Sequence, residues 1–375
     1  SITADLHKYI IDDETFEINY GAEYNYNNVR SSAFRTDILT DIETQNILTR
    51  YPSGGSGTSN VAAYALLKKM YARFSLFGGL RYSDNGLMVR YNRSDNLPWP
   101  EAFYEGISSR NSALSWSLGV SSNKVKGWKV SSQVSSAFRS PNIDDLAKIR
   151  VKFDEISIPN IDLTPEQSIN AELTVAKEIA GLHQISATAF VTTLDNAIIR
   201  ENLHLPDGTS FLIDEGDTLR TVGNINANHA LVRGISLNAK STIFNKIAAN
   251  ASINYIRGIS SDAADVNTPL SHIPPIYGRA SLVYRDARST YNLNLTYNGK
   301  KPLEEYGGSA DNIENATSDG TPAWYTLNFY YQQKLLESMS VSVALENILD
   351  QHYRPFASGV SAPGRNLIVS CNVSF

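Results

Sequence analysis

Alternation of apolar and polar residues along many short segments constrains the fold of this chain more than any other feature. The last segment shows the pattern clearly. Its odd-numbered positions are apolar from Leu367 to Phe375, whereas Ser370, Asn372 and Ser374 on the other face are polar. Successive side chains of a β-strand point to opposite faces of a sheet, so a period of two predicts strands with one apolar face. The chain is therefore predicted to be all-β.

About fourteen such segments of roughly ten residues follow one another, the length that a tilted strand needs to cross an outer membrane. Strands of a soluble sandwich average about five or six residues. One face carries Leu, Val, Ala and aromatic residues, and the other carries Ser, Asn, Thr and Gly. We expect a transmembrane antiparallel up-and-down β-barrel, with a soluble sandwich as the alternative. The predicted strands are 16–24, 59–70, 73–84, 114–121, 128–138, 167–177, 184–194, 230–240, 247–255, 277–286, 291–297, 322–332, 339–347 and 367–375.

The connections between these segments alternate between short turns and long polar stretches. Short periplasmic turns and long extracellular loops are the rule for outer-membrane barrels, so the alternation sets the direction of every strand. It places Phe375 at the periplasmic rim. The long connections are 27–58, 84–110, 139–166, 195–229, 259–276, 300–321 and 348–365.

Composition excludes several other classes of protein. Hydrophobic residues make up 42% of the chain and charged residues 19%, and no run approaches the 18 apolar residues of a spanning helix. A net charge of −5 gives no basic surface for nucleic acid, and the single Cys371 excludes an internal disulfide. The six histidines stand in no catalytic or metal-binding motif, which leaves an outer-membrane hydrolase as a poor alternative. No signal peptide precedes Ser1, so we expect a processed or truncated chain.

Three motifs stand at predicted strand ends. Segment 137–142 reads AFRSPN, segment 158–166 reads IPNIDLTPE, and segment 346–350 reads ENILD. They resemble the FRAP, NPNL-PE and ENLFD boxes of the TonB-dependent outer-membrane receptors. A final aromatic, Phe375, resembles the signal that the barrel-assembly machinery reads. The residues that carry the resemblance in the three boxes are Phe138, Arg139, Pro141, Pro159, Asn160, Leu163, Glu346 and Asn347.

The resemblance implies a larger protein than this chain. Members of the family have a 22-stranded barrel and an N-terminal plug that bears the TonB box, and neither plug nor box is recognisable here. A barrel of fourteen strands has a lumen of roughly 18 Å, too narrow for a folded plug of roughly 36 Å, whereas 22 strands leave a lumen of roughly 34 Å. We therefore expect residues 1–375 to be the C-terminal part of the barrel, with the plug and the first strands missing.

By the same resemblance, the intact protein is a receptor for the active uptake of a scarce nutrient and not an enzyme. It would receive energy from the inner-membrane TonB complex through the plug and carry no cofactor. An iron complex, either a ferric siderophore or haem, is the expected nutrient. Haem-type members place a His between the first two boxes, and residues 142–158 contain none. Cobalamin or oligosaccharide uptake and a passive porin are the alternatives.

Candidate ligand-facing residues lie in the long connections near the motifs. Arginines suit an anionic siderophore at a water-facing rim. Alternatively, these charged residues pair with one another to fix the loops, or bind lipopolysaccharide phosphates. Catalytic and metal-binding residues are not predicted, and outer-membrane lipid and lipopolysaccharide are expected partners. The candidates are Arg139, Asp144, Asp145, Arg200, Tyr353, Arg354 and Arg365.

Overall fold

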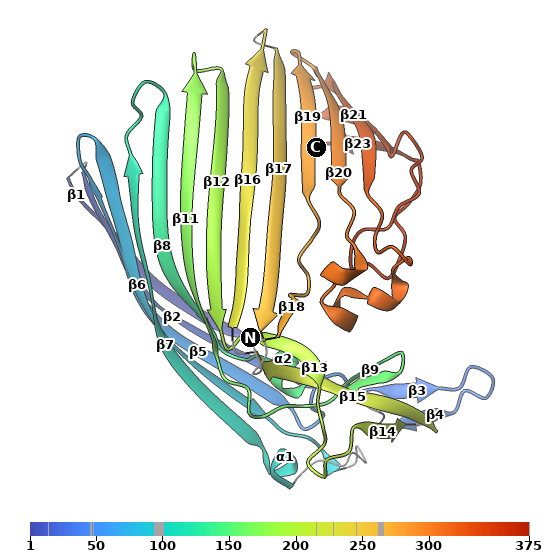
Figure 1. Cartoon of the computed structure of the whole chain (residues 1–375). Helices are drawn as coiled ribbons and strands as arrows, with labels where there is room; N and C mark the ends of the chain where they lie inside the picture. The colour runs from blue at the N-terminus through green and yellow to red at the C-terminus, as the bar shows by residue number, and fades with distance from the viewer. Residues whose placement is uncertain are drawn as a thin grey trace.

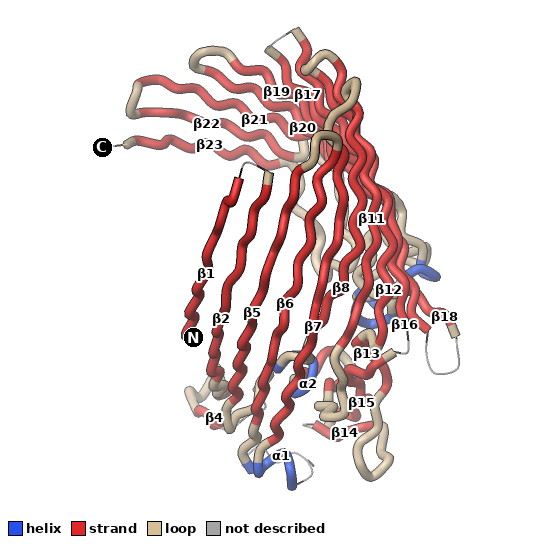
Figure 2. Tube along the Cα trace, turned by 90° about the vertical axis from the view of Figure 1, so that its left-hand side faces the viewer, coloured by secondary structure: helices blue, strands red, loops and turns tan. Residues whose placement is uncertain are grey.

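The computed structural model describes residues 1–13, 15–45, 47, 49–93, 101–214, 216–227, 229–244, 246–261 and 266–374. One large antiparallel sheet dominates it and curls into a barrel wall (Figures 1 and 2). In order across the sheet, its strands are β1 (Ile2–Asp13), β2 (Phe16–Val29), β5 (Ser56–Met70), β6 (Phe74–Val89), β7 (Ile107–Ser122), β8 (Trp128–Arg139), β11 (Glu166–Ile179), β12 (His183–Asp195), β16 (His229–Ile243), β17 (Ile247–Ser261), β19 (Tyr277–Arg285), β20 (Ser289–Asn298), β21 (Trp324–Leu336), β22 (Met339–Glu346) and β23 (Asn366–Val373).

The sheet confirms the predicted fold class, and each of the predicted segments overlaps one of its strands. It also contains β1, which the sequence pattern missed. Lys8 explains the omission, because its register partner Tyr20 is on the outward, apolar face and a charge there interrupts the alternation. Among the described residues no register pair joins β1 to β23, so these two strands are the free edges of the sheet.

Short turns and long loops separate to opposite ends of the wall, as predicted. Tight hairpins connect the strands at the end near the C-terminus, and the N-terminus lies at the other end among the loops (Figure 1). The loops hold the shorter elements: β3 (Phe34–Thr36), β4 (Glu43–Gln45), α1 (Glu101–Glu105), α2 (Ile143–Ala147), β9 (Arg150–Lys152), β10 (Glu155–Ser157), β13 (Ile198–Asn202), β14 (Phe211–Asp214), β18 (Asn267–Pro269), η2 (Leu303–Glu305), η3 (Gly308–Asp311) and η4 (Ile313–Asn315).

The outer face of the wall is apolar and open. Leu118 on β7 and Leu237 on β16 are 62% and 46% exposed, whereas the alternating Ser117 and Ser236 face the interior and are half-buried. Aromatic residues pair across strands toward the loop end of this outer face, as Tyr297 does with Tyr325. Tyr and Trp rings suit the membrane interface, so the row fits an aromatic girdle. No helix in the described ranges is long and apolar enough to cross a membrane.

Most buried apolar side chains lie outside the barrel wall, at its loop end. The loop ends of the wall strands extend toward them: β6 continues to Val89, which is 1% exposed. This extension explains why several strands are longer than the ten-residue alternating segments. Phe375, the predicted assembly signal, lies outside the described residues, so its role stays a prediction.

Candidate functional site

Two long connections that we predicted as separate loops fold together into one small sheet, which we call the loop sheet. It contains β9 and β10 from the connection 139–166 and β13, β14 and β15 (Asp217–Asn226) from the connection 195–229, in the order β13-β15-β10-β9 with β14 beside β15. Strands β10 and β15 run parallel, with Glu155 opposite Arg220. The two loops therefore form a single body at the loop end of the wall.

An apolar cluster beneath this sheet, which we call the loop core, holds it in place. The OH of Tyr91 is also buried there and donates a hydrogen bond of 2.7 Å to the carbonyl of Ala147. Burial of this many apolar side chains is what stabilises a small soluble domain. The loop core consists of Leu87, Val89, Tyr91, Phe103, Leu146, Ala147, Ile149, Ile156, Ile158, Leu163, Leu205 and Leu219.

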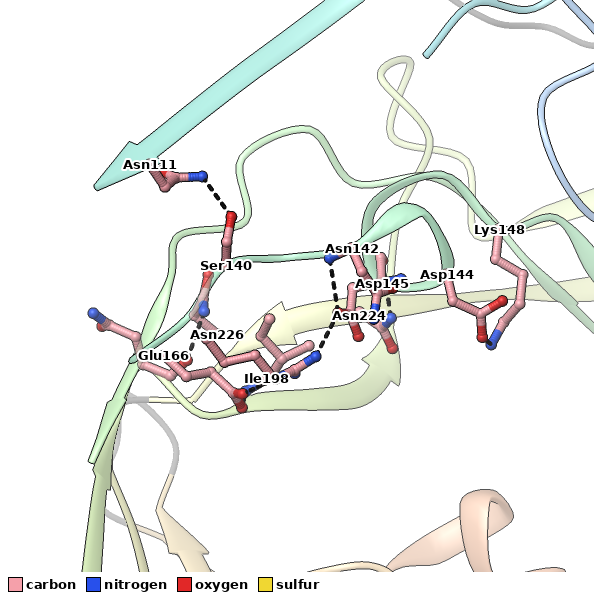
Figure 3. Close-up of polar contacts among 12 residues, drawn as sticks. Asn111, Ser140, Asn142, Asp144, Asp145, Lys148, Glu166, Ile198, Asn224 and Asn226 are labelled. Atoms are coloured by element: carbon pink, nitrogen blue, oxygen red, sulfur yellow. Dashed lines mark hydrogen bonds and ion pairs between the residues drawn. The ribbon is translucent and has the colours of Figure 1, made fainter. Parts of the chain in front are cut away.

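The first motif box fixes the exit from β8. Arg139 forms ion pairs with Asp145, at 2.5 Å, and with Glu166 at the start of β11. Asn142 caps α2. Its side-chain oxygen accepts a hydrogen bond of 2.9 Å from the backbone N–H of Asp145, and the Asp145 carboxylate accepts one of 3.0 Å from the backbone N–H of Asn142 (Figure 3). Pro141 is buried and Phe138 half-buried. Reciprocal capping satisfies two backbone donors at a helix start.

The second motif box ties the same helix to the loop sheet. The Asn160 amide donates to the carbonyl of Leu146 at 3.0 Å, and its side chain donates to the carbonyl of Asn224 at 2.8 Å. Asn224 returns a hydrogen bond of 2.9 Å to the carbonyl of Asp145 (Figure 3). Glu166 accepts from the amide of Ile198 at 2.7 Å. The box also supplies Pro159 and Leu163, which are buried. Both boxes thus shape one unit, which consists of the loop sheet, α2 and the loop core and which we call the loop body.

Asp144 points the other way, toward the connection 27–58. Its carboxylate accepts from Arg50, with a contact of 3.0 Å, and from Lys148 at 2.9 Å. Burial alone would raise the pKa of Asp144, but the hydrogen bonds from Lys148, Arg50 and Tyr51 hold it below its usual value. A depressed carboxyl pKa means that the charged form contributes to folding stability near neutral pH.

Arg200 lies within the loop sheet and not at a free rim. It donates to Ser157 at 2.9 Å and to Glu155 at 3.1 Å, and Arg220 contacts the other oxygen of the same carboxylate. Glu155 is 5% exposed. The Nε of Arg200 is buried and has no hydrogen-bond partner among the described residues. A buried carboxylate between two guanidinium groups is well compensated and holds the two loops together.

Two of the remaining candidates, Tyr353 and Arg354, lie in a second loop region, formed by connections 300–321 and 348–365. Tyr353 packs on Trp324, with ring centroids 4.2 Å apart, and Arg354 donates to the carbonyl of Asn315 at 2.5 Å. These residues line a cavity of about 240 Å³. The Nε1 of Trp324 is buried and without a partner in the described part of the chain. Trp324 is itself one of the residues that line the cavity.

The third motif box shapes the start of this second region. Asn347 has a positive φ of 46° and is 4% exposed. Its side chain donates to the carbonyl of Gln351 at 2.9 Å and accepts from the amide of that residue at 2.9 Å. Glu346 accepts from the OH of Tyr330 at 3.2 Å. Arg365 directly precedes the last strand, β23, and its side chain donates a hydrogen bond to the carbonyl of Ile348.

A bridge joins the two loop regions. Lys152 on β9 donates to the Asn312 side chain at 2.6 Å and lies 3.2 Å from Glu314. Asn312 in turn donates to the carbonyl of Ala357 at 2.6 Å. The structure therefore brings Arg139, Asp144, Asp145 and Arg200 together in the loop sheet region and Tyr353 and Arg354 in the cavity region, while Arg365 stays apart.

Sequence reasoning missed several residues that build this site. Glu155, Arg220 and Asn224 lie in stretches whose alternation is too short to stand out, although 149–158 does alternate weakly. Arg50 is 94 positions from its partner Asp144, and nothing local to either residue indicates the pairing. In the described part of the chain, no group of three or more His, Cys, Asp or Glu residues could hold a metal ion.

Two curated relatives match part of this chain. An iron-regulated outer membrane virulence protein of Vibrio cholerae is 23% identical over 254 residues, which cover 66% of this chain and 37% of that relative. A probable hemoglobin and hemoglobin-haptoglobin-binding protein of Haemophilus influenzae is 23% identical over 76% of this chain and 31% of its own length. The matches thus span about a third of these relatives.

A solved structure and a family model extend the match to the fold of the whole chain. The copper transporter OprC superposes with a TM-score of 0.77 at 16% identity, over 100% of this chain and 56% of that one. The model of the β-barrel of TonB-dependent receptor-like proteins matches residues 3–348. With its curled antiparallel sheet and its first two motif boxes folded into one loop body, the chain belongs to the TonB-dependent receptor family of outer-membrane β-barrels, whose members are receptors and transporters and not enzymes.

Proposed function

We propose that this chain is the C-terminal barrel wall and part of the extracellular binding face of a receptor that takes up an iron complex with energy from the TonB system. The observation that carries the proposal is the loop body: the first two motif boxes tie two long loops into one packed unit with a polar surface at the loop end of the strands. A preorganised platform loses little conformational entropy when a ligand binds.

The names of the relatives support iron as the cargo. One is named an iron-regulated outer membrane virulence protein and the other a probable haemoglobin-binding protein. The segment 142–158 offers no His to ligate a haem iron, so a ferric siderophore is as good a candidate as haem. The cavity is lined by Tyr353, Arg354 and Trp324, and the buried indole N–H of Trp324 has no hydrogen-bond partner among the described residues. Such groups suit an aromatic ligand that carries oxygen acceptors.

The charge of the platform limits how it attracts a ligand. Connections 139–166 and 195–229 together contain twelve acidic and six basic side chains. A net negative field repels an anionic complex at a distance, so recognition must rest on local contacts. Added salt screens that repulsion and should therefore leave the association rate of an anionic siderophore unchanged or higher.

We propose further that the intact receptor adds strands and a plug to this chain. The free edges at β1 and β23 support this, because unpaired backbone groups in lipid cost several kcal/mol each. Contact with TonB would then occur through the plug. A passive porin is disfavoured, since the loop body and the family match both belong to a receptor.

Growth of an iron-starved host that carries the intact gene tests the proposal. Haem and ferric siderophores are each supplied as the sole iron source, and uptake should require TonB. Deletion of 142–157 removes α2, β9 and β10 and should abolish uptake while the wall still assembles. Deletion of 34–45, which removes the separate β3–β4 hairpin, is the matched control and should retain uptake.

Two results would contradict the proposal. Growth on neither iron source, with growth on cobalamin or a glycan instead, would overturn the iron assignment. Uptake that continues without TonB would overturn the receptor mechanism and favour a passive channel.

A further inference from the structure

A pair of arginines lies on the outer face of the wall, away from the binding platform. Arg233 on β16 is the direct register partner of Arg257 on β17, and both are exposed. Their outward direction follows from the alternation, since Ile235 and Tyr255, two positions along each strand, are 51% and 49% exposed on the same face. Like charges directly opposite each other in a strand pair destabilise it.

The height of this pair on the wall can be read from the register. Ile247 pairs with Tyr284, which belongs to a row of tyrosines near the periplasmic turns that continues with Tyr291 and Tyr331. Arg257 lies ten residues further along β17 than Ile247. Ten residues of a tilted strand rise about 25 Å, the height of the apolar band of an outer-membrane barrel. The two guanidinium groups therefore lie level with the headgroups of the outer leaflet.

The protein itself does not neutralise the pair. Neither arginine forms a hydrogen bond or an ion pair among the described residues. Asp195, on the strand next to β16, pairs instead with His229 at 2.7 Å. Guanidinium groups that face the membrane surface without an ion-pair partner in the chain are available to an anion from outside it.

A hollow beside Arg257 is lined by charged side chains of both signs. Its volume is about 300 Å³, and Tyr255, Arg257, Lys300 and Lys301 are among its lining residues. Glu304 and Glu305 also line it, and Glu305 lies 3.6 Å from Lys301. Burial lowers the pKa of Lys301, and Arg257 lowers it further, although Glu305 opposes the shift. Arg257 and Lys301 are thus close enough to repel each other.

We propose that Arg233 and Arg257 form a binding site for a phosphate group of an outer-leaflet lipid, as carried by lipopolysaccharide, with Tyr255 packed beneath it. Each guanidinium offers a planar fork of N–H donors that matches phosphate oxygens, and a bridging phosphate turns the repulsion between the two cations into attraction. The site is independent of the nutrient and fixes the depth of the wall in the membrane.

The test uses the intact receptor purified from outer membranes. Lipopolysaccharide that remains bound is measured by native mass spectrometry and phosphorus analysis. The double variant Arg233→Gln/Arg257→Gln should lose about tenfold in affinity for phosphorylated lipid, and Arg233→Lys/Arg257→Lys should lose less. Arg279→Gln on β19 removes the same kind of charge from the inward face, opposite Ser252, and should bind like the wild type.

Further measurements separate the possible causes of a result. Heat-dependent gel mobility shows whether each variant is folded. Lipopolysaccharide and inorganic phosphate are compared for their effect on the unfolding temperature of the wild type, and only the lipid should raise it. Equal retention of lipid by the double variant would overturn the site, as would equal loss in Arg279→Gln. Protection by inorganic phosphate alone would overturn the lipid as its source.

Discussion

The barrel wall and the loop body place the same types of apolar residue in opposite environments. In the wall, Leu118 is 62% exposed and the half-buried face carries Ser117. In the loop body, Ile156 and Leu146 are each 1% exposed, while charged groups such as Asp144 lie nearer the surface. The wall presents its apolar side chains to lipid, whereas the loop body buries them from water. One chain thus contains both a membrane-type and a soluble-type arrangement.

The difference also concerns what holds each region together. Continuous ladders of backbone hydrogen bonds join the strands of the wall, as between β16 and β17. Apart from β15, the strands of the loop sheet have only three to five residues, so side-chain packing and buried ion pairs must contribute much of its stability. A change in the loop core should therefore alter the loop body without unfolding the wall.

The largest expected effect concerns the outward face of the wall. In a Cys371→Ser background, Leu118→Cys in native membranes should react with a lipid-soluble maleimide and not with a charged, impermeant one, because its side chain faces lipid. Ser117→Cys, the adjacent residue on the inward face, should show the opposite preference. Equal reaction of both variants with the charged reagent would break the comparison, since the wall would then have no lipid face.

A smaller effect is expected from a cavity in the loop core. Ile156→Ala should lower the free energy of opening of the loop body by about 2–4 kcal/mol, because a buried side chain is truncated in a packed cluster. Hydrogen exchange of the β10 and β15 amides measures this opening. Leu118→Ala is the control and should leave it unchanged. If Ile156→Ala also destabilises the wall, as judged by heat-dependent gel mobility, then the two regions are not separate units.

The smallest expected effect is on the amide protection of α2, and it tests the ion pair between Asp144 and Arg50. Since the pKa of Asp144 is depressed in the folded protein, its contribution is present above the unfolded pKa of about 3.9 and is lost as the pH falls through the lower folded value. Protection of the α2 amides, corrected for intrinsic exchange, should fall only about two- to fivefold in that acidic window, because the pair is partly exposed.

Asp144→Asn should already show the weaker protection at neutral pH and should lack the additional loss in acid. A wild-type loss centred above pH 5 would mean that another group controls the helix. In that case Asp144 would not account for the link between α2 and the connection 27–58.

The alternating sequence determined the wall almost completely. It gave the strand order, the outward face and the positions of turns and loops, because neighbouring strands in an antiparallel meander are also neighbours in sequence. It missed β1, where Lys8 lies opposite Tyr20 on the apolar face. The motif boxes also marked the right places, at the exit from β8 and the entry to β11.

The loop body was decided by tertiary structure alone. The parallel pairing of Glu155 with Arg220 joins residues 65 positions apart, and the pairing of Arg50 with Asp144 joins residues 94 positions apart. No local period or propensity encodes such contacts, since they depend on how two loops pack over a shared core. A structure can be predicted from sequence where its contacts join residues that are close in the chain and where each face meets either lipid or water. Where distant segments bury each other, only the packed arrangement decides which charges meet and which remain for a ligand.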